Sequence, residues 1–176
     1  MSDTFASALW GADYLFDLAE QGVVGANFHG GFSTHGYTPI ALDKNSQYFA
    51  RPLYYGMLLF HAAAEGRIVP VQVNTPLNVT AHAVLGSDGS FHLVIINKDA
   101  EQPISAEIDS GKPYSSAMAL RLLAPSLDAQ DGITLAGSSV STDGTWLPSV
   151  EERVDRKAAA YQIAVPPASA VIVTFK

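Results

Sequence analysis

Cysteine is absent from this 176-residue chain, which excludes disulfides, thiolate zinc sites and cysteine nucleophiles. Charge is also scarce, because charged residues make up 15% of the sequence and 17 acidic residues outnumber 10 lysines and arginines. The net charge of -7 repels nucleic acids and anionic membranes, and no basic cluster offsets it locally. No apolar run approaches the roughly 18 residues that span a bilayer. We therefore expect neither nucleic acid nor a membrane as a partner.

Hydrophobic residues, at 48%, are abundant enough to fill the core of one or two domains. The first predicted element is a capped amphipathic helix from Asp3 to Gln21, ended by Gly22. One face repeats apolar residues at spacings of three and four, namely Phe5, Leu9, Ala12, Phe16 and Ala19. The opposite face carries Asp13, Asp17 and Glu20. Because Met1 directly precedes the cap at Ser2 and Asp3, we expect an artificial or processed start.

A short apolar run from Val23 to Phe28 predicts a parallel strand that is covered on both faces. Residues 29–50 then predict a loop long enough to be functional, and Pro52 begins a second helix that ends at Gly66. The expected buried face of that helix is Leu53, Met57, Phe60 and Ala64. Helix, strand, loop and helix is the order that closes a (β/α)8 barrel, which needs roughly 250 residues. Residues 1–67 are therefore predicted to be a C-terminal remnant of a barrel.

Residues 68–176 are predicted to form an antiparallel β-sandwich domain. Val79 to Leu85 and Phe91 to Asn97 form a hairpin, with His82 and His92 as a cross-strand surface pair. Further strands are expected at residues 104–108, 117–123, 160–165 and 170–175, separated by Gly, Pro, Ser and Asp clusters. The predicted fold class is thus α/β plus all-β, with closing βα units of a (β/α)8 barrel followed by the sandwich.

Several motifs together resemble the C-terminal part of bacterial glycoside hydrolase family 79, the β-glucuronidase and heparanase-like enzymes. They are Ser-Asp-Thr-Phe-Ala-Ser-Ala-Leu-Trp10, Asn-Phe-His-Gly-Gly31, Tyr-Thr-Pro-Ile40, Tyr-Tyr-Gly-Met-Leu-Leu-Phe60 and Pro-Pro-Ala-Ser-Ala-Val-Ile-Val173. The resemblance covers essentially the whole chain and is strongest in residues 2–60. It implies a retaining hydrolase of β-linked glucuronides that has a (β/α)8 barrel and an appended β-sandwich.

The resemblance also implies that both catalytic glutamates lie outside this chain, since the family carries them after the fourth and seventh barrel strands. Retaining hydrolysis needs two carboxyl groups about 5 to 5.5 Å apart. The acidic residues before position 67 are assigned to a helix cap, a polar helix face, a loop and a helix end, namely Asp3, Asp13, Asp17, Glu20, Asp43 and Glu65. We therefore expect the isolated chain to be inactive.

What remains of the implied site is the loop after the last barrel strand, where the family holds the carboxylate of glucuronic acid. By position, the substrate-binding residues are His29, Gly36 and Tyr37. Two structural alternatives stay open: His29 satisfied by backbone at a strand end, and Tyr37 as a loop anchor packed on Pro39. A metal triad of His29, His35 and Asp43 has no recognised spacing. The family uses no metal, so neither a metal nor a cofactor is expected.

The expected partners are a β-glucuronide carbohydrate, bound through the parent enzyme, and the missing N-terminal barrel segment. Without that segment, the apolar faces of residues 1–67 must dock on the sandwich or associate with another copy of the chain. The sequence leaves the compartment of the parent open, and a secreted or periplasmic bacterial parent is compatible with it. Two other hypotheses remain: an autonomous carbohydrate-binding or structural β-sandwich module, and a two-chain enzyme assembled from separate pieces.

Overall fold

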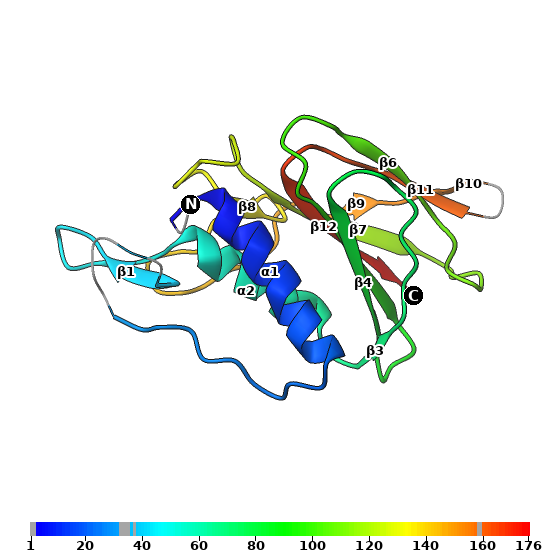
Figure 1. Cartoon of the computed structure of the whole chain (residues 1–176), viewed down its shortest axis with the longest axis horizontal. Helices are drawn as coiled ribbons and strands as arrows, with labels where there is room; N and C mark the ends of the chain where they lie inside the picture. The colour runs from blue at the N-terminus through cyan, green and yellow to red at the C-terminus, as the bar shows by residue number, and fades with distance from the viewer. Residues whose placement is uncertain (1–2, 32–35, 37, 158–159) are drawn as a thin grey trace.

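The computed structural model describes residues 3–31, 36, 38–157 and 160–176, arranged in three layers (Figure 1). Two helices, α1 (Phe5–Glu20) and α2 (Pro52–Ala63), pack against one face of a large sheet. A small sheet covers the opposite face of the large one. The helices therefore dock on the sandwich within the same chain, as one of the two predicted alternatives requires.

The large sheet has the strand order β3-β4-β5-β12-β7-β8, with β9 also paired to β7. Its strands are β3 (Arg67–Val69), β4 (Val79–Leu85), β5 (Phe91–Asn97), β7 (Ala117–Leu123), β8 (Thr134–Leu135), β9 (Glu152–Arg153) and β12 (Ser169–Phe175). The small sheet has the order β10-β11-β6, from β6 (Ile104–Ile108), β10 (Arg156–Lys157) and β11 (Ala160–Val165). The pairings within both sheets are antiparallel. The structure thus confirms an antiparallel sandwich and the predicted hairpin of β4 and β5.

Alternation along the central strand β12 divides the core into two halves. Val171, Val173 and Phe175 face the small sheet, whereas Ala170 and Ile172 face the helices. Successive side chains of a strand point to opposite faces, so one strand serves both halves. The large sheet is therefore buried on both sides, which explains why its central strands are apolar almost throughout.

The predicted apolar face of α1 is confirmed at Phe5, Leu9, Ala12 and Phe16, which are all buried, whereas Ala19 is half-buried. The predicted cap is wrong, because Thr4 occupies the N-cap position and makes no side-chain capping hydrogen bond. Instead, the amides of Phe5 and Ala6 donate to the carbonyls of Ala129 and Leu127. The loop before β8 thus satisfies the free N–H groups that a side chain would otherwise cap.

The predicted buried face of α2 is only partly right. Leu53 is buried, whereas Met57, Phe60 and Ala64 are half-buried, and the core is filled by Tyr55, Gly56, Leu59 and Ala63. The face shifts because α2 packs against α1 as well as against the sheet. A Cβ built on Gly56 would lie 2.2 Å from the carbonyl oxygen of Ala8, so this glycine allows the close approach of the two helices.

Two predictions for residues 21–50 are wrong. Val23 to Phe28 is extended but forms no ladder within the part of the chain that the structure describes, so no closing βα unit of a barrel forms there. A strand needs a neighbour for its N–H and C=O groups, and the described residues provide none beside it. The expected loop instead contains a small hairpin of β1 (Ile40–Leu42) and β2 (Tyr48–Ala50). Among the described helices, none is both long and apolar enough to cross a membrane.

Candidate functional site

The three predicted substrate-binding residues fall in the segment that joins α1 to the hairpin of β1 and β2. His29 is exposed near the end of the extended segment 23–31. Gly36 is half-exposed and has φ 128°, a backbone region that favours glycine. Tyr37 and His35 lie outside the described residues, so the predictions for them stay predictions. His29 lines a groove beside α1, whereas Gly36 is hydrogen-bonded to Arg51, so the two residues belong to different features of the structure.

His29 lines an apolar groove of about 900 Å³ between α1 and segment 23–29. Trp10 and Tyr14 form its α1 side, with stacked rings whose centroids lie 5.0 Å apart. Trp10 is 53% exposed and Tyr14 is 39% exposed. A large aromatic surface left open in this way is typical of a surface that another element covers. The apolar part of the groove is therefore suited to packing against another element.

Gly36 contacts Arg51, a residue that the sequence analysis did not single out. Nη1 of Arg51 donates a hydrogen bond to the Gly36 carbonyl, and the Arg51 amide donates to the Pro39 carbonyl at 2.9 Å. Nε lies 3.7 Å from Oδ1 of Asp3. Arg51 is only 2% exposed, although it immediately precedes α2. A buried arginine at a loop junction follows no periodic pattern in the sequence. The only feature that could have pointed to Arg51 is its position directly before Pro52, where α2 begins.

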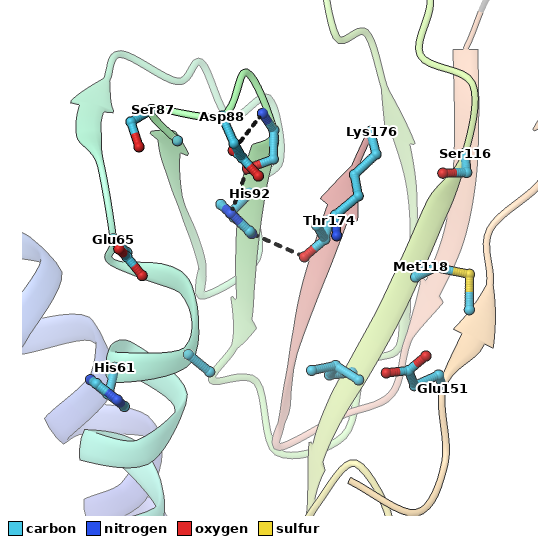
Figure 2. A pocket seen from close by; sticks show the side chains of 14 residues that line it. His61, Glu65, Ser87, Asp88, His92, Ser116, Met118, Glu151, Thr174 and Lys176 are labelled. Carbon is cyan, nitrogen blue, oxygen red and sulfur yellow. Dashed lines mark hydrogen bonds between the residues drawn. The ribbon is translucent and has the colours of Figure 1, made fainter.

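A polar cavity of about 520 Å³ lies beyond the C-terminal end of α2, where the large sheet is no longer covered by helix (Figure 2). A hydrogen-bonded chain crosses its wall: Ser90 Oγ donates to Asp88, His92 Nε2 lies 3.1 Å from Ser90 Oγ, and His92 Nδ1 lies 3.0 Å from Thr174 Oγ1. Burial, assisted by Lys176, lowers the pKa of His92 below its usual value although Asp88 and Glu65 oppose the shift. His92 is therefore a neutral ring that is satisfied within the protein.

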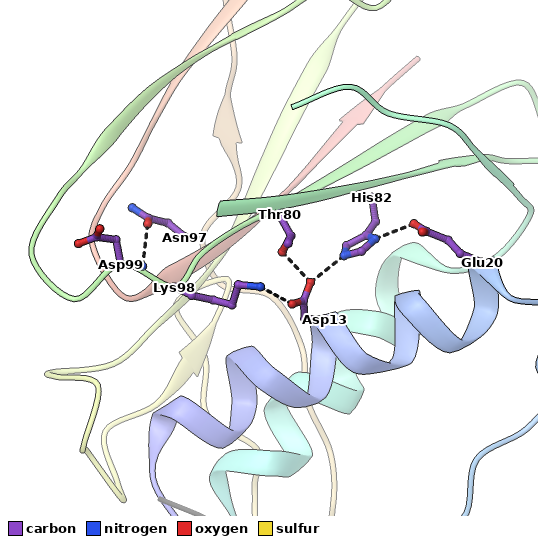
Figure 3. A network of polar contacts seen from close by, with 7 residues as sticks. All are labelled: Asp13, Glu20, Thr80, His82, Asn97, Lys98 and Asp99. Carbon is purple, nitrogen blue, oxygen red and sulfur yellow. Dashed lines mark hydrogen bonds and ion pairs between the residues drawn. The ribbon is translucent and has the colours of Figure 1, made fainter. Parts of the chain in front are cut away.

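A second polar network joins α1 to the edge of the large sheet (Figure 3). His82, on β4, is 4% exposed, and its ring nitrogens lie 2.9 Å from Asp13 Oδ1 and 2.8 Å from Glu20 Oε1. Thr80 donates to Asp13 at 2.6 Å, and Lys98 forms an ion pair with Asp13. The ring of His82 also stacks on Phe16, with centroids 4.8 Å apart.

This arrangement shifts the pKa of both central groups. Burial alone would raise the pKa of Asp13, but hydrogen bonds from His82, Lys98 and Thr80 outweigh it and lower the pKa to about 2. Burial would likewise lower the pKa of His82, but its bonds to Asp13 and Glu20 raise it above 6.5. His82 therefore holds its proton more tightly than a free imidazole does, and its protonated ring can donate to two carboxylates of α1. The predicted surface pair of His82 and His92 is wrong, because His82 is paired with Val94 and Val84 with His92 in the register.

In the same network, one ligand atom each from Asp13, Asp17 and His82 lies within 4.8 Å of the others, a spacing that a metal ion would require. Asp13 and His82 are already hydrogen-bonded to each other, and Lys98 adds a positive charge to Asp13. A cation there would have to displace both, so the donor set fits a proton better than a metal. The geometry describes a structural clasp between α1 and the sandwich.

The acidic residues of residues 3–67 are largely engaged in structure. Asp13 and Glu20 hold His82, Asp3 lies beside Arg51, and Asp43 accepts from the amides of Asn45 and Gln47 in the turn between β1 and β2. A pair of catalytic carboxyl groups faces one another across an open cleft. The engaged carboxylates instead face partners within the chain.

Comparison with protein families gives a match to the glycosyl hydrolase family 79 C-terminal beta domain over residues 81–172, more than half of the chain. A search of curated proteins finds no match. The matched residues run from β4 to β12 and so include both sheets. The sequence resemblance to family 79 is thus confirmed for the sandwich.

Three of the solved structures with a similar fold are glycosidases that are much longer than this chain. A 4-O-α-L-rhamnosyl-β-D-glucuronidase from Fusarium oxysporum 12S has a TM-score of 0.75 at 17% identity, over 98% of this chain and 39% of its own. A family 51 arabinofuranosidase from Xanthomonas axonopodis pv. citri gives 0.68 at 14% identity, over 99% and 36%. A family 30 xylanase C from Talaromyces cellulolyticus gives 0.61 at 18% identity, over 96% and 35%. The chain therefore spans well under half the length of these enzymes.

Proposed function

The chain belongs to the glycosyl hydrolase family 79 C-terminal beta domains and is the C-terminal part of such an enzyme, and from this premise we propose that the enzyme is a retaining hydrolase of β-linked glucuronides. In this proposal the chain supplies the accessory β-sandwich and part of the pocket that binds the uronate. The observation that carries the proposal is the family match over residues 81–172. The Fusarium glucuronidase, similar over 98% of this chain, supports the choice of substrate class.

Residues 1–67 are proposed to be the C-terminal remnant of a (β/α)8 barrel, and residues 68–176 the β-sandwich domain. The fold similarity to the three glycosidases extends over 96% or more of the chain, so it includes α1 and α2 as well as the sheets. Segment 23–31, which forms no ladder with the described residues, and the groove beside it also support this division, because the neighbouring barrel strands would have to come from the missing segment. The missing N-terminal barrel segment is then the expected partner of this surface.

The proposed chemistry divides between the chain and that segment. The two glutamates needed for retaining hydrolysis would be supplied by the missing strands, about 5 to 5.5 Å apart. This chain would supply His29, Gly36 and Tyr37 around the sugar carboxylate. Glycine lets the backbone approach an anion closely, and a phenol hydroxyl provides a donor that distinguishes a uronate from a neutral sugar. No metal or cofactor has a role in this proposal.

The alternative is an autonomous carbohydrate-binding or structural module without catalysis. One observation favours it: both helices already bury their apolar faces on the large sheet, which gives the chain a core of its own. The module hypothesis predicts that the gene encodes no barrel upstream of Ser2. The enzyme hypothesis predicts a strand segment that carries a glutamate there.

The deciding experiment expresses the full reading frame and assays it against a chromogenic β-glucuronide beside the matching β-glucoside. We expect turnover of the glucuronide by the full enzyme and no turnover by the 176-residue chain, which serves as the control. A full reading frame that contains a barrel but prefers the glucoside would refute the uronate assignment. Turnover by the pure isolated chain would refute the placement of the catalytic glutamates.

A further inference from the structure

A second groove, of about 770 Å³, lies between α2 and the loop that joins β8 to β9, and it is called here the Trp146 groove. Its helical side is a stripe at spacings of four and three, Tyr54, Leu58 and His61, continued by Glu65 just after the helix. Successive residues of a helix are turned by about 100°, so this stripe lies opposite Gly56, where α2 touches α1. Tyr54 and Leu58 are half-buried, and His61 and Glu65 are exposed. The stripe therefore belongs to a face of α2 that helix packing does not use.

The other side of this groove is the half-buried ring of Trp146, and the chain holds that ring in one orientation. Its Nε1 donates to the Leu135 carbonyl at 3.0 Å, and part of the ring packs on the core beneath the helices. The same loop is tied to α2, because the Val140 amide donates to the Tyr55 hydroxyl at 3.1 Å. The aromatic surface is thus formed before any ligand arrives, which lowers the entropy that binding costs.

The polar cavity described above adjoins the Trp146 groove, since His61, Ala62 and Glu65 line both. Figure 2 shows His61 on α2 and Glu65 just beyond the end of the helix, at the border of the cavity. The cavity adds hydroxyl and charged side chains, namely Ser87, Asp88, Ser116, Glu151, Thr174 and Lys176. Each hollow lies within the range of roughly 300–1,000 Å³ that is typical of ligand sites. Together they offer an aromatic ring beside several acceptors for hydroxyl donors.

We propose that the Trp146 groove and the polar cavity form a binding site for the neutral sugar units of an oligosaccharide. A neutral sugar has a face of C–H groups, which can pack on an indole, and hydroxyl groups at its edge, which can donate to carboxylates. A uronate would instead bring a negative charge to a lining in which Glu65, Asp88 and Glu151 outnumber Lys176.

The same lining disfavours a protein as the occupant, because the centre of a protein interface is depleted of charged residues. The site requires no catalytic group and concerns neutral sugars, so the inference goes beyond the proposed function. It does not depend on which glycosidic bond the parent enzyme cleaves.

The first experiment follows the indole N–H signals of the isotope-labelled 176-residue chain by NMR during titration with oligosaccharides. The chain has two tryptophans, Trp146 and Trp10, so the exposed ring of Trp10 in the groove beside α1 is an internal control. We expect xylohexaose or cellohexaose, which are neutral, to shift the Trp146 signal and to leave the Trp10 signal in place. The acidic hexamer of galacturonic acid should bind at least about tenfold more weakly. Binding of neither neutral hexamer, equal binding of the acidic one, or a shift confined to Trp10 would overturn the proposal.

The second experiment compares the affinity of variants for the neutral hexamer that binds. Trp146→Ala removes the ring, and Glu65→Gln removes a charge from an exposed side chain, so it reports on the site even if Trp146→Ala fails to fold. The matched controls are Trp10→Ala and Glu101→Gln, because both residues are exposed and line neither hollow. We expect binding to weaken at least about tenfold for Trp146→Ala, about threefold for Glu65→Gln and not at all for the controls. Unchanged affinity in Glu65→Gln and in a folded Trp146→Ala, or equal losses in the controls, would overturn the proposal.

The third experiment repeats the titration with the full enzyme, because the missing segment is the competing occupant of the groove. We expect the full enzyme to bind the neutral hexamer with an affinity within about threefold of that of the 176-residue chain, and Glu65→Gln to weaken it by the same factor. Binding by the chain but not by the full enzyme would show that the missing segment covers the groove and would overturn the site. The readout is binding without turnover, so it is independent of the glucuronide assay.

Discussion

Replacing His82 with phenylalanine tests how α1 is held on the sandwich. The change keeps a planar ring against Phe16 and removes both ring nitrogens, so Asp13 and Glu20 each lose a partner. Removing one member of a buried ion pair costs about 3–5 kcal/mol. Asp13 retains Thr80 and Lys98, and Glu20 is 38% exposed, so we expect a loss of about 2–3 kcal/mol near pH 5.5. For a chain of this size that corresponds to a fall in Tm of about 4–12 °C.

The pH dependence of this loss follows from the direction of the pKa shifts. His82 has a folded pKa above 6.5, so its stabilisation is fully present below pH 6.5 and is lost as the pH rises through the folded pKa. Asp13 has a folded pKa of about 2, so its contribution is present above pH 3.8 and is lost as the pH falls toward 2. The stability gap between wild type and His82→Phe should therefore be widest between about pH 4 and 6.5 and narrow at higher pH.

The assay is urea unfolding of the 176-residue chain at a series of pH values from 5 to 9. His92→Phe is the control. Burial lowers the pKa of His92, so its contribution to stability should change with pH in the opposite direction to that of His82. The contribution of His92 to stability is lost as the pH falls below 6.5. The stability gap between wild type and His92→Phe should therefore narrow at acid pH. A gap for His82→Phe that does not change across the series would show that the ring acts only by packing, and the bridging role would be wrong.

Three further predictions concern the pocket, the helix contact and the open groove. In the full enzyme, Tyr37→Phe should lower kcat/KM on a glucuronide by about 10- to 150-fold, the equivalent of a charge-assisted hydrogen bond, with little effect on the glucoside; no loss on either would remove Tyr37 from the site. Gly56→Ala should cost about 1–3 kcal/mol in urea unfolding because its Cβ would meet the backbone of Ala8, whereas Gly25→Ala, with open space around it, should cost much less. The exposed rings of Trp10 and Tyr14 should promote self-association of the isolated chain, which light scattering would detect and Trp10→Ser should reduce; a strict monomer at all concentrations would contradict this.

Much of the fold could be predicted from local patterns. The longer strands β4, β5, β6, β7, β11 and β12 alternate or run apolar between turn residues, so hairpins such as β4 and β5 can be located from the sequence alone. The two-residue strands β8, β9 and β10 were not predicted, because two residues show no period. The small hairpin of β1 and β2 was missed because each strand has three residues, which is too short for a period to be recognised. The strand predicted at residues 23–28 has the apolar pattern of a strand, yet it does not form one, because the described part of the chain provides no neighbouring strand.

The polar contacts could not be predicted in the same way. Asp13 and His82 are 69 residues apart, and nothing in either local pattern indicates that they meet. Asp13 was assigned to a solvated helix face because charged residues normally are, yet its side chain is only 13% exposed. Arg51 was missed because buried arginines are rare and have no periodicity. In each case the pairing depends on how α1 and α2 cross the sheet, which is a property of the tertiary structure.

The distribution of exposed apolar side chains bears on which of the two hypotheses for the chain is better. Val24 is fully exposed in segment 23–31, and Trp10 and Tyr14 are exposed beside it, whereas the core between the two sheets is closed. An autonomous module would gain nothing from an aromatic groove next to a segment whose N–H and C=O groups lack a ladder. A barrel remnant requires both features, because the covering strands and helices belong to the rest of the polypeptide. The similar glycosidases are more than twice as long as this chain, and the enzyme hypothesis requires additional chain of this kind to cover that face.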